Sequence, residues 1–300
     1  MKVVLTNLSN KLYEASRFQL NDSARKHGIT ETNSYDFENL KPTSFYKNNR
    51  HILDQPRGIG YWCWKPYIIL ETLKSLSDGD IVIYSDCGIE VIENLEPLIN
   101  ICKEKRPVLL FANGNFKNAA WTKRDCFVLM NCDTKKYLQG LQVDAAFALF
   151  RKSDIAIQFL EEWQKYCLDE RVVGDLPNTC GKKNYWGFQQ HRWDQSVLSL
   201  LAIKYGIELH RVPTQFGNHY KSPEYRVPNE FNCINQNKSK QVNFYSSEPF
   251  FNSPYSQLLN HHRTKIGADV YDEEKKSIIE KIFISGKRRT KKIIKFLSRT

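Results

Sequence analysis

One aspartate, Asp86, stands two positions after a short apolar segment at residues 81–84, and Gly88 stands two positions further along. The segment is rich in β-branched residues and has turn-forming residues on both sides, so it predicts a buried strand. Open α/β sheets bind their ligands at the carboxyl ends of strands, and a glycine there lets a phosphate or a metal ion approach the backbone closely. We expect Asp86 to contact a ligand at this edge, with a strand-end turn residue as the alternative.

A second aspartate, Asp194, stands at the start of an apolar segment that predicts a helix over residues 194–205. An imidazole, an indole, this carboxylate and an amide occur within five residues, from His191 through Trp193 to Gln195. Such a set can hold the hydroxyl groups of a substrate and remove a proton from one of them. We expect Asp194 and His191 to act in catalysis and Trp193 and Gln195 to contact an acceptor; the alternative for Asp194 is a helix N-cap.

Two further polar positions lie beside predicted elements. Asp144 and Gln142 precede a strand predicted over residues 145–150. Asp144 is a further catalytic candidate, with a turn residue as the alternative, and Gln142 is expected to contact a ligand. Lys65 follows Trp64 at the start of a predicted helix. Its ammonium group can neutralise a departing anion, or it can be a solvated helix-start lysine. Trp64 can stack on a ligand or pack the helix start against the sheet.

The opening of the chain predicts a β-α-β unit. A strand is expected over residues 3–6, a helix over 13–27 and a second strand from residue 29 onward. Thr6 and Asn7 would then lie at the end of the first strand, where this kind of sheet contacts a nucleotide.

Later apolar and amphipathic segments continue the alternation. Further helices are expected over 65–76, 95–103, 153–168 and 194–205, and strands over 81–84, 108–112 and 145–150. Residues 171–190 and 213–254 are rich in polar and turn-forming residues and predict surface loops. The chain therefore predicts an α/β protein with a Rossmann-like mixed sheet flanked by helices.

Positive charge is concentrated at the end of the chain. Residues 281–300 contain eight basic and no acidic residues, which leaves +3 of the formal net charge of +11 for the rest. Their apolar and basic residues fall on different faces of a helix, as in an amphipathic helix on an anionic membrane surface. A solvated or disordered basic tail is the alternative. Nucleic-acid binding is not expected, because aromatic residues are scarce there.

The composition fits a globular protein of the cytoplasm. Of the 300 residues 41% are hydrophobic, without an apolar run long enough to span a bilayer or a hydrophobic signal core near the first residue. The eight cysteines form no C-x-x-C pair, which disfavours a zinc site and fits buried thiols in a reducing compartment.

Four ordered segments resemble a family of bacterial glycosyltransferases that act in capsule and lipopolysaccharide synthesis. The segments are residues 58–70, 80–88, 142–154 and 191–201, and the likeness extends over residues 1–265. The resemblance implies a GT-A-type fold and transfer of a sugar from a nucleotide-diphosphate donor to a growing glycan. It divides residues 1–265 into a nucleotide-binding half, 1–112, and an acceptor or catalytic half, 113–265, and leaves residues 266–300 as the membrane-associating tail.

GT-A enzymes usually hold a divalent cation, Mn²⁺ or Mg²⁺, with two aspartates one residue apart. Here the second position is Gly88, so Asp86 is the expected metal ligand, and His262 is a tentative second one with an exposed loop histidine as the alternative. Mg²⁺ needs only one or two protein carboxylates beside phosphate oxygens. The residues expected to contact the donor are Thr6, Asn7, Trp64, Lys65, Asp86, Gly88 and Gln142.

Two classes of function follow from these expectations. The first is a hexosyltransferase, peripheral on the inner face of the cell membrane, that acts on a lipid-linked surface glycan. The second is a non-catalytic module that binds a nucleotide sugar or a glycan, which the missing second aspartate favours. A phosphatase with Asp86 as nucleophile fits less well, because the aspartate usual two residues later is Gly88.

Overall fold

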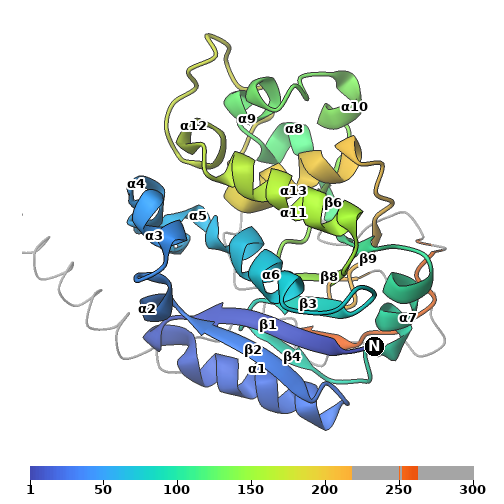
Figure 1. Ribbon diagram of the computed structural model, residues 1–300. Coiled ribbons are helices and arrows are strands. Elements are labelled where there is room, and N and C mark those ends of the chain that lie inside the picture. The colour runs from blue at the N-terminus through green and yellow to red at the C-terminus, as the bar shows by residue number, and fades with distance from the viewer. Residues whose placement is uncertain (218–249, 251, 263–300) are drawn as a thin grey trace, which may run out of the picture.

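The computed structural model describes residues 1–217, 250 and 252–262. The basic tail, 266–300, and most of the loop expected over 213–254 lie outside the described residues. The core of the fold is a five-stranded mixed sheet with strand order β2-β1-β3-β8-β5 (Figure 1). Its strands are β1 Val3–Ser9, β2 Glu31–Asp36, β3 Ile81–Ser85, β8 Phe147–Arg151 and β5 Val108–Leu109.

The sheet is parallel at one side and antiparallel at the other. β1 runs parallel to β2 and β3, and β8 runs antiparallel to both β3 and β5. Because the chain goes from β1 to one neighbour and returns to the other, β1 and β3 flank the point where the strand order reverses. Such a switch point leaves a crevice at the carboxyl ends of the strands, and this is where open α/β sheets bind ligands.

Alternating side chains of β3 supply both faces of the sheet. Ile81 and Ile83 point into one apolar core, and Val82 and Tyr84 point into the other. All five residues of β3 are buried, as expected of a strand covered on both faces by helices. The two cores take residues from both halves of the chain, because β8 lies between β3 and β5.

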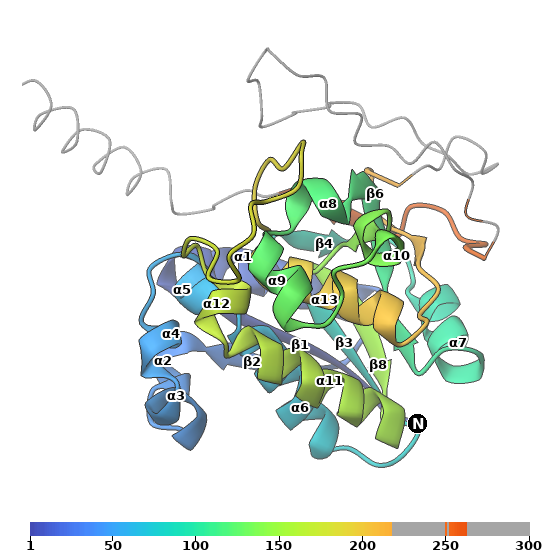
Figure 2. The ribbon, with the colours of Figure 1, turned by 90° about the horizontal axis from the view of Figure 1, so that it is seen from above.

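Helices cover both faces of this sheet (Figure 2). Helix α1, Glu14–Lys26, and helix α7, Glu96–Glu104, pack on the face of Ile81 and Ile83. On the opposite face lie α6, Trp64–Lys74, α11, Asp154–Cys167, and α13, Trp193–Lys204.

Shorter elements complete the fold. The remaining helices are α2 Phe37–Leu40, α3 Ser44–Asn48, α4 Arg50–Leu53, α5 Gly58–Tyr61, α8 Asn118–Trp121, α9 Arg124–Leu129, α10 Lys135–Leu138 and α12 Glu170–Val173, with a 3₁₀ turn at Lys11–Tyr13. Two small sheets pair β4 Ile89–Val91 with β10 Leu259–His261, and β6 Phe111–Lys117 with β7 Leu141–Val143 and β9 His210–Arg211. Within the described residues, no helix has the length and hydrophobicity needed to cross a bilayer.

The α/β class and the mixed sheet flanked by helices are confirmed, and the expected helices and strands occur close to their expected positions. Two differences matter. The first strand continues to Ser9 instead of ending at Thr6, and the apolar run at 108–112 is divided between β5 and β6, which belong to different sheets. The seven cysteines that the structure describes are unpaired thiols, six of them buried.

Candidate active site

Asp86 lies where its strand predicts, at the carboxyl end of β3 beside the switch point. Its backbone N–H donates to the carbonyl of Ala146, and the neighbouring Cys87 thiol lies 3.3 Å from the carbonyl oxygen of Leu8 in β1. The Asp86 side chain is 33% exposed. The backbone at Asp86 and Cys87 is therefore held by β1 and by the residue before β8, while the carboxylate still faces solvent.

A buried ammonium group holds this carboxylate from the interior. Lys65, in the first turn of α6, is 3% exposed, and its Nζ lies 3.0 Å from Oδ1 and 3.4 Å from Oδ2 of Asp86. The hydroxyl of Tyr84 also donates to Oδ1, at 2.5 Å. Lysine is rarely buried unless it is paired, so this burial indicates a specific role for the charge.

The same ammonium joins Asp86 to Asp194. Nζ of Lys65 lies 3.5 Å from Oδ2 of Asp194 and donates to the carbonyl of Ala145 at 3.0 Å. The contact with Asp194 is an ion pair without hydrogen-bond geometry, because Oδ2 of Asp194 accepts no hydrogen bond from the described residues. Burial lowers the pKa of Lys65, but Asp194 and Asp86 raise it more, so the group stays charged. Lys65 is buried, so its charge acts on a ligand mainly through the exposed carboxylate of Asp86.

Asp194 itself is 3% exposed. It lies inside the first turn of α13, whose N-cap residue is Arg192, so the N-cap alternative does not hold. Burial raises its pKa to about 7, against the attraction of Lys65. A carboxyl group that titrates near neutral pH can both accept and release a proton. In this structure Asp194 reaches the exposed edge only by way of Lys65.

Asp144 lies at the border of the same cluster. It is half-buried, its Oδ1 accepts the N–H of Ala146, and the carbonyl of Ala146 accepts the N–H of Asp86. Its charge also raises the pKa of Lys65. The structure thus gathers three expected carboxylates, Asp86, Asp144 and Asp194, around one cation.

Gln142 and Gln195 are also brought together. Gln142 is fully buried, its Oε1 accepts from Nε2 of Gln195 at 2.9 Å, and its Nε2 donates to Asn118 and Thr122. This network ties the start of α13 to α8 and so supports the position of Asp194. Gln195 is half-buried and retains access to the surface.

Other expected residues have interior roles. The ring nitrogens of His191 contact Lys123 N at 3.2 Å and Val172 O at 3.0 Å, and burial lowers its pKa to about 3. Thr6 contacts Thr72 and Asn33, and Asn7 donates to Asn21, with both residues fully buried. The carboxyl edge lies three residues beyond Thr6, because β1 is longer than expected.

An unusual backbone segment precedes Lys65. Residues 58–62 all have positive φ, and three of them, Ile59, Tyr61 and Trp62, are not glycine. A left-handed conformation costs an L-residue roughly 1–2 kcal/mol, and such strain collects at functional sites. The turn places the ring of Trp62 5.2 Å from that of Trp193, which also has a positive φ.

The indoles beside this turn differ in exposure. Trp64 is 5% exposed and its Nε1 donates to the Gly58 carbonyl, which fits packing of the helix start. Trp193 is 6% exposed and its Nε1 donates to Asp175, while Trp62 is half-buried.

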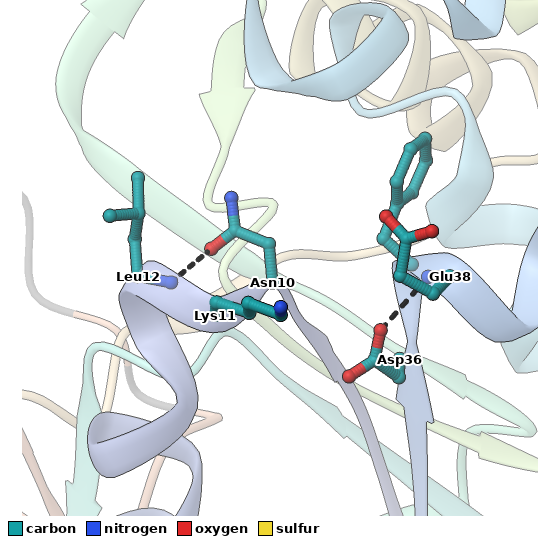
Figure 3. A pocket seen from close by; sticks show the side chains of 6 residues that line it. Asn10, Lys11, Leu12, Asp36 and Glu38 are labelled. Carbon is teal, nitrogen blue, oxygen red and sulfur yellow. Dashed lines mark hydrogen bonds between the residues drawn. The ribbon is translucent and has the colours of Figure 1, made fainter.

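Sequence reasoning missed a pocket on the other side of β1. It has a volume of about 220 Å³ and is lined by Asn10, Lys11, Leu12, Asp36, Phe37 and Glu38 (Figure 3). Asn10 follows β1, Asp36 ends β2, and each side chain accepts a backbone N–H at the start of a short helix. The sequence signal for this pocket was an Asn or Asp at a strand end, where such a side chain can accept a backbone N–H at the start of a helix. The pocket and Asp86 therefore lie on opposite sides of one strand end.

The divalent cation implied by the resemblance can be tested against these side chains. His262 does lie beside the Asp86 loop, since its backbone N–H donates to the carbonyl of Gly88 at 3.0 Å. Burial lowers the pKa of His262. In the described part of the chain, however, no three His, Cys, Asp or Glu side chains form a metal-binding group. Asp86 is already neutralised by Lys65, so these residues do not fit a divalent cation held by the protein.

Comparisons with known proteins give only distant likenesses. No known protein family matches this chain, and no curated protein matches it. Similar solved structures include mouse xyloside xylosyltransferase 1 in its apo form (10% identity, TM-score 0.44, covering 88% of this chain and 98% of that one). Another is the apo WbbM bifunctional glycosyltransferase (15% identity, TM-score 0.38, covering 67% of this chain and 37% of that one). A third is an active-site mutant of LgtC (12% identity, TM-score 0.41, covering 87% of this chain and 87% of that one). These TM-scores are below 0.5, so the functional argument rests on the site.

Proposed function

We propose that this chain is a glycosyltransferase that moves a hexose from a nucleotide-diphosphate sugar to a growing, lipid-linked surface glycan. One observation carries the proposal: a partly exposed carboxylate, Asp86, stands at the switch point and is held from the interior by a buried ammonium, which also pairs with a second carboxylate, Asp194. The ligand crevice of an open α/β sheet lies at this place. The resemblance of four sequence segments to bacterial glycosyltransferases supports the same reading.

The donor would extend across the end of β1. Its nucleoside part would occupy the pocket between Asn10 and Asp36 (Figure 3). Its sugar would lie beside Asp86. Gly88 leaves the backbone beside Asp86 without a side chain, which gives the diphosphate room.

Transfer requires a bond exchange at the anomeric carbon. An acceptor hydroxyl oxygen attacks that carbon, the bond to the diphosphate oxygen breaks, and its electron pair leaves with the diphosphate. Asp86 faces the positive charge that develops on the sugar and takes the hydroxyl proton. Lys65 contacts both Asp86 and Asp194, so its charge couples the protonation of one carboxyl group to that of the other.

The test is release of nucleoside diphosphate from a panel of nucleotide sugars. Asp86→Asn should reduce turnover about 100-fold or more, since loss of one preorganised electrostatic group has effects of this size. Asp78→Asn is the matched control, because Asp78 is exposed and precedes the other end of β3. Turnover should persist in EDTA. Equal turnover by wild type and Asp86→Asn would refute the assignment of Asp86.

A second candidate is a non-catalytic module that binds a nucleotide sugar, which Gly88 in place of a second carboxylate favours. A selective ligand raises the melting temperature of the state it binds. A nucleotide sugar that raises the melting temperature but releases no nucleoside diphosphate, with or without acceptor glycans, would favour this module over the transferase.

The proposed location is the inner face of the cell membrane. It rests on the basic residues of 281–300, which lie outside the described residues. Deletion of 281–300 should weaken sedimentation of the protein with vesicles that contain phosphatidylserine; unchanged sedimentation would count against the tail as an anchor.

A further inference from the structure

One aromatic side chain is fully exposed in the part of the chain that the structure describes. Trp186 is 100% exposed, whereas Trp163 is 1% exposed. It lies in the loop between α12 and α13, residues 174–192, which projects past α9 at the top of Figure 1 and again outward in Figure 2. Leu176 in the same loop is 44% exposed. A fully exposed indole in a projecting loop leaves a large apolar surface in water that no described residue covers.

The loop that carries Trp186 is firmly held. The carboxylate of Asp125 is fully buried and accepts three hydrogen bonds, from the N–H and hydroxyl of Thr179 at 2.7 and 2.9 Å and from the N–H of Cys180 at 2.8 Å. Lys123, also buried, donates to the carbonyls of Gly174 and Leu176.

The segment next to the indole is fixed as well. Asp133 accepts from the hydroxyl of Tyr185 at 2.6 Å and from Lys182 at 3.1 Å. The guanidinium of Arg124 lies 3.8 Å from the centre of the Tyr185 ring, and the backbone N–H of Arg124 donates to Asn184. The residue before Trp186 is thus clamped on one side, so the ring is presented by a preorganised loop and little ordering entropy is lost when it binds.

Charge around the tip is positive. Lys182 and Lys183 precede Trp186 in the loop and both are exposed. Lys135 and Lys136 are exposed on α10, the helix that directly follows Asp133 in the chain. Asp133 lies between Arg124 and Lys182 and is neutralised by them. The loop that carries the indole, and the helix that follows its contact residue Asp133, therefore expose basic side chains.

We infer that the 174–192 loop docks on an anionic lipid surface, with Trp186 in the headgroup region and the lysines against lipid phosphates. Indoles favour this region because they are apolar with one polar N–H, and lysine side chains extend toward the charged surface. A convex tip suits a planar partner, whereas sugar-binding sites are concave with polar groups beside the ring. This inference concerns the described domain and does not depend on the tail or on the proposed reaction.

The full-length chain is tested with phosphatidylcholine vesicles, with or without phosphatidylserine, that contain brominated lipid to quench nearby indoles. The wild type should lose fluorescence on vesicles with phosphatidylserine, and Trp186→Ser should lack this quenching and bind about tenfold more weakly, as expected when one aromatic side chain no longer leaves water. Lys183→Gln should weaken binding about fivefold, only when phosphatidylserine is present.

Phe18→Ser is the matched control, because Phe18 is 60% exposed on α1, which covers the other face of the sheet. It should bind like wild type. Since the Trp186 side chain is fully exposed, Trp186→Ser should melt at the wild-type temperature, which separates docking from folding. Equal vesicle binding and equal quenching of wild type and Trp186→Ser would overturn the inference, and so would an indole response to soluble glycans but not to vesicles.

Discussion

The raised pKa of Asp194 makes the stability of the protein depend on pH in a defined direction. In the folded protein the carboxyl has a pKa of about 7, against an ordinary value of 3.8, chiefly because it is buried. Between these values the folded chain keeps a proton that the unfolded chain has released. The free energy of unfolding therefore falls as pH rises from about 4 to about 7, by up to roughly 4 kcal/mol at about 1.4 kcal/mol per pH unit.

Asp194→Asn isolates this contribution, because the amide has the same shape and does not titrate. Burial lowers the pKa of His191 to about 3, so His191 makes the protein less stable as pH falls below about 6.5 and opposes the effect of Asp194. The informative quantity is therefore the difference between wild type and variant, measured by urea unfolding from pH 5 to pH 8. The wild type should lose stability relative to Asp194→Asn as pH rises. Parallel curves for the two proteins would refute the buried, proton-holding carboxyl, and Asp78→Asn should run parallel to wild type.

Two further substitutions test the support of the site. Lys65→Met should lower the free energy of unfolding by about 3–5 kcal/mol, because it removes the cation that pairs with the buried Asp194 and with Asp86. Urea unfolding measures this. Lys65→Arg should retain part of the stability, and a loss below about 1 kcal/mol would contradict the ion pair. Gly60→Ala should lower the melting temperature, measured by calorimetry, more than Gly79→Ala does. Both glycines have positive φ, but an added Cβ at Gly60 would lie 2.7 Å from the Cα of Leu53, whereas nothing lies within 4 Å of one at Gly79. Equal losses would mean that the left-handed turn is not closely packed.

The strand ending at Asp86 was predictable because local signals agree there. A short β-branched run with turns on both sides can form little except a strand, and the helix over Asp154–Cys167 begins where Ser153 accepts the N–H of Ala156. By contrast, residues 108–112 form one apolar run that serves two sheets. Hydrophobicity predicts burial there, but it does not say which neighbours the strand meets.

The ion cluster was only partly predictable. Asp86 and Asp194 could be selected by their place beside strand and helix ends. The burial of Lys65 between them could not be predicted, because a lysine near a helix start is usually solvated. Its burial depends on contacts with distant residues, the carbonyl of Ala145 and the carboxylate of Asp194. The backing of the 174–192 loop by Asp125 and Asp133 depends likewise on contacts between distant segments.

The position of β8 between β3 and β5 has a consequence during synthesis on the ribosome. The three parallel strands can pair once residue 85 has emerged, but the outer side of β3 has no partner until Arg151 follows. Over that interval the nascent chain presents an apolar strand with unpaired backbone groups, the kind of edge on which other chains aggregate. A chain stalled between β5 and β8 would therefore need chaperone protection, first of all at β3.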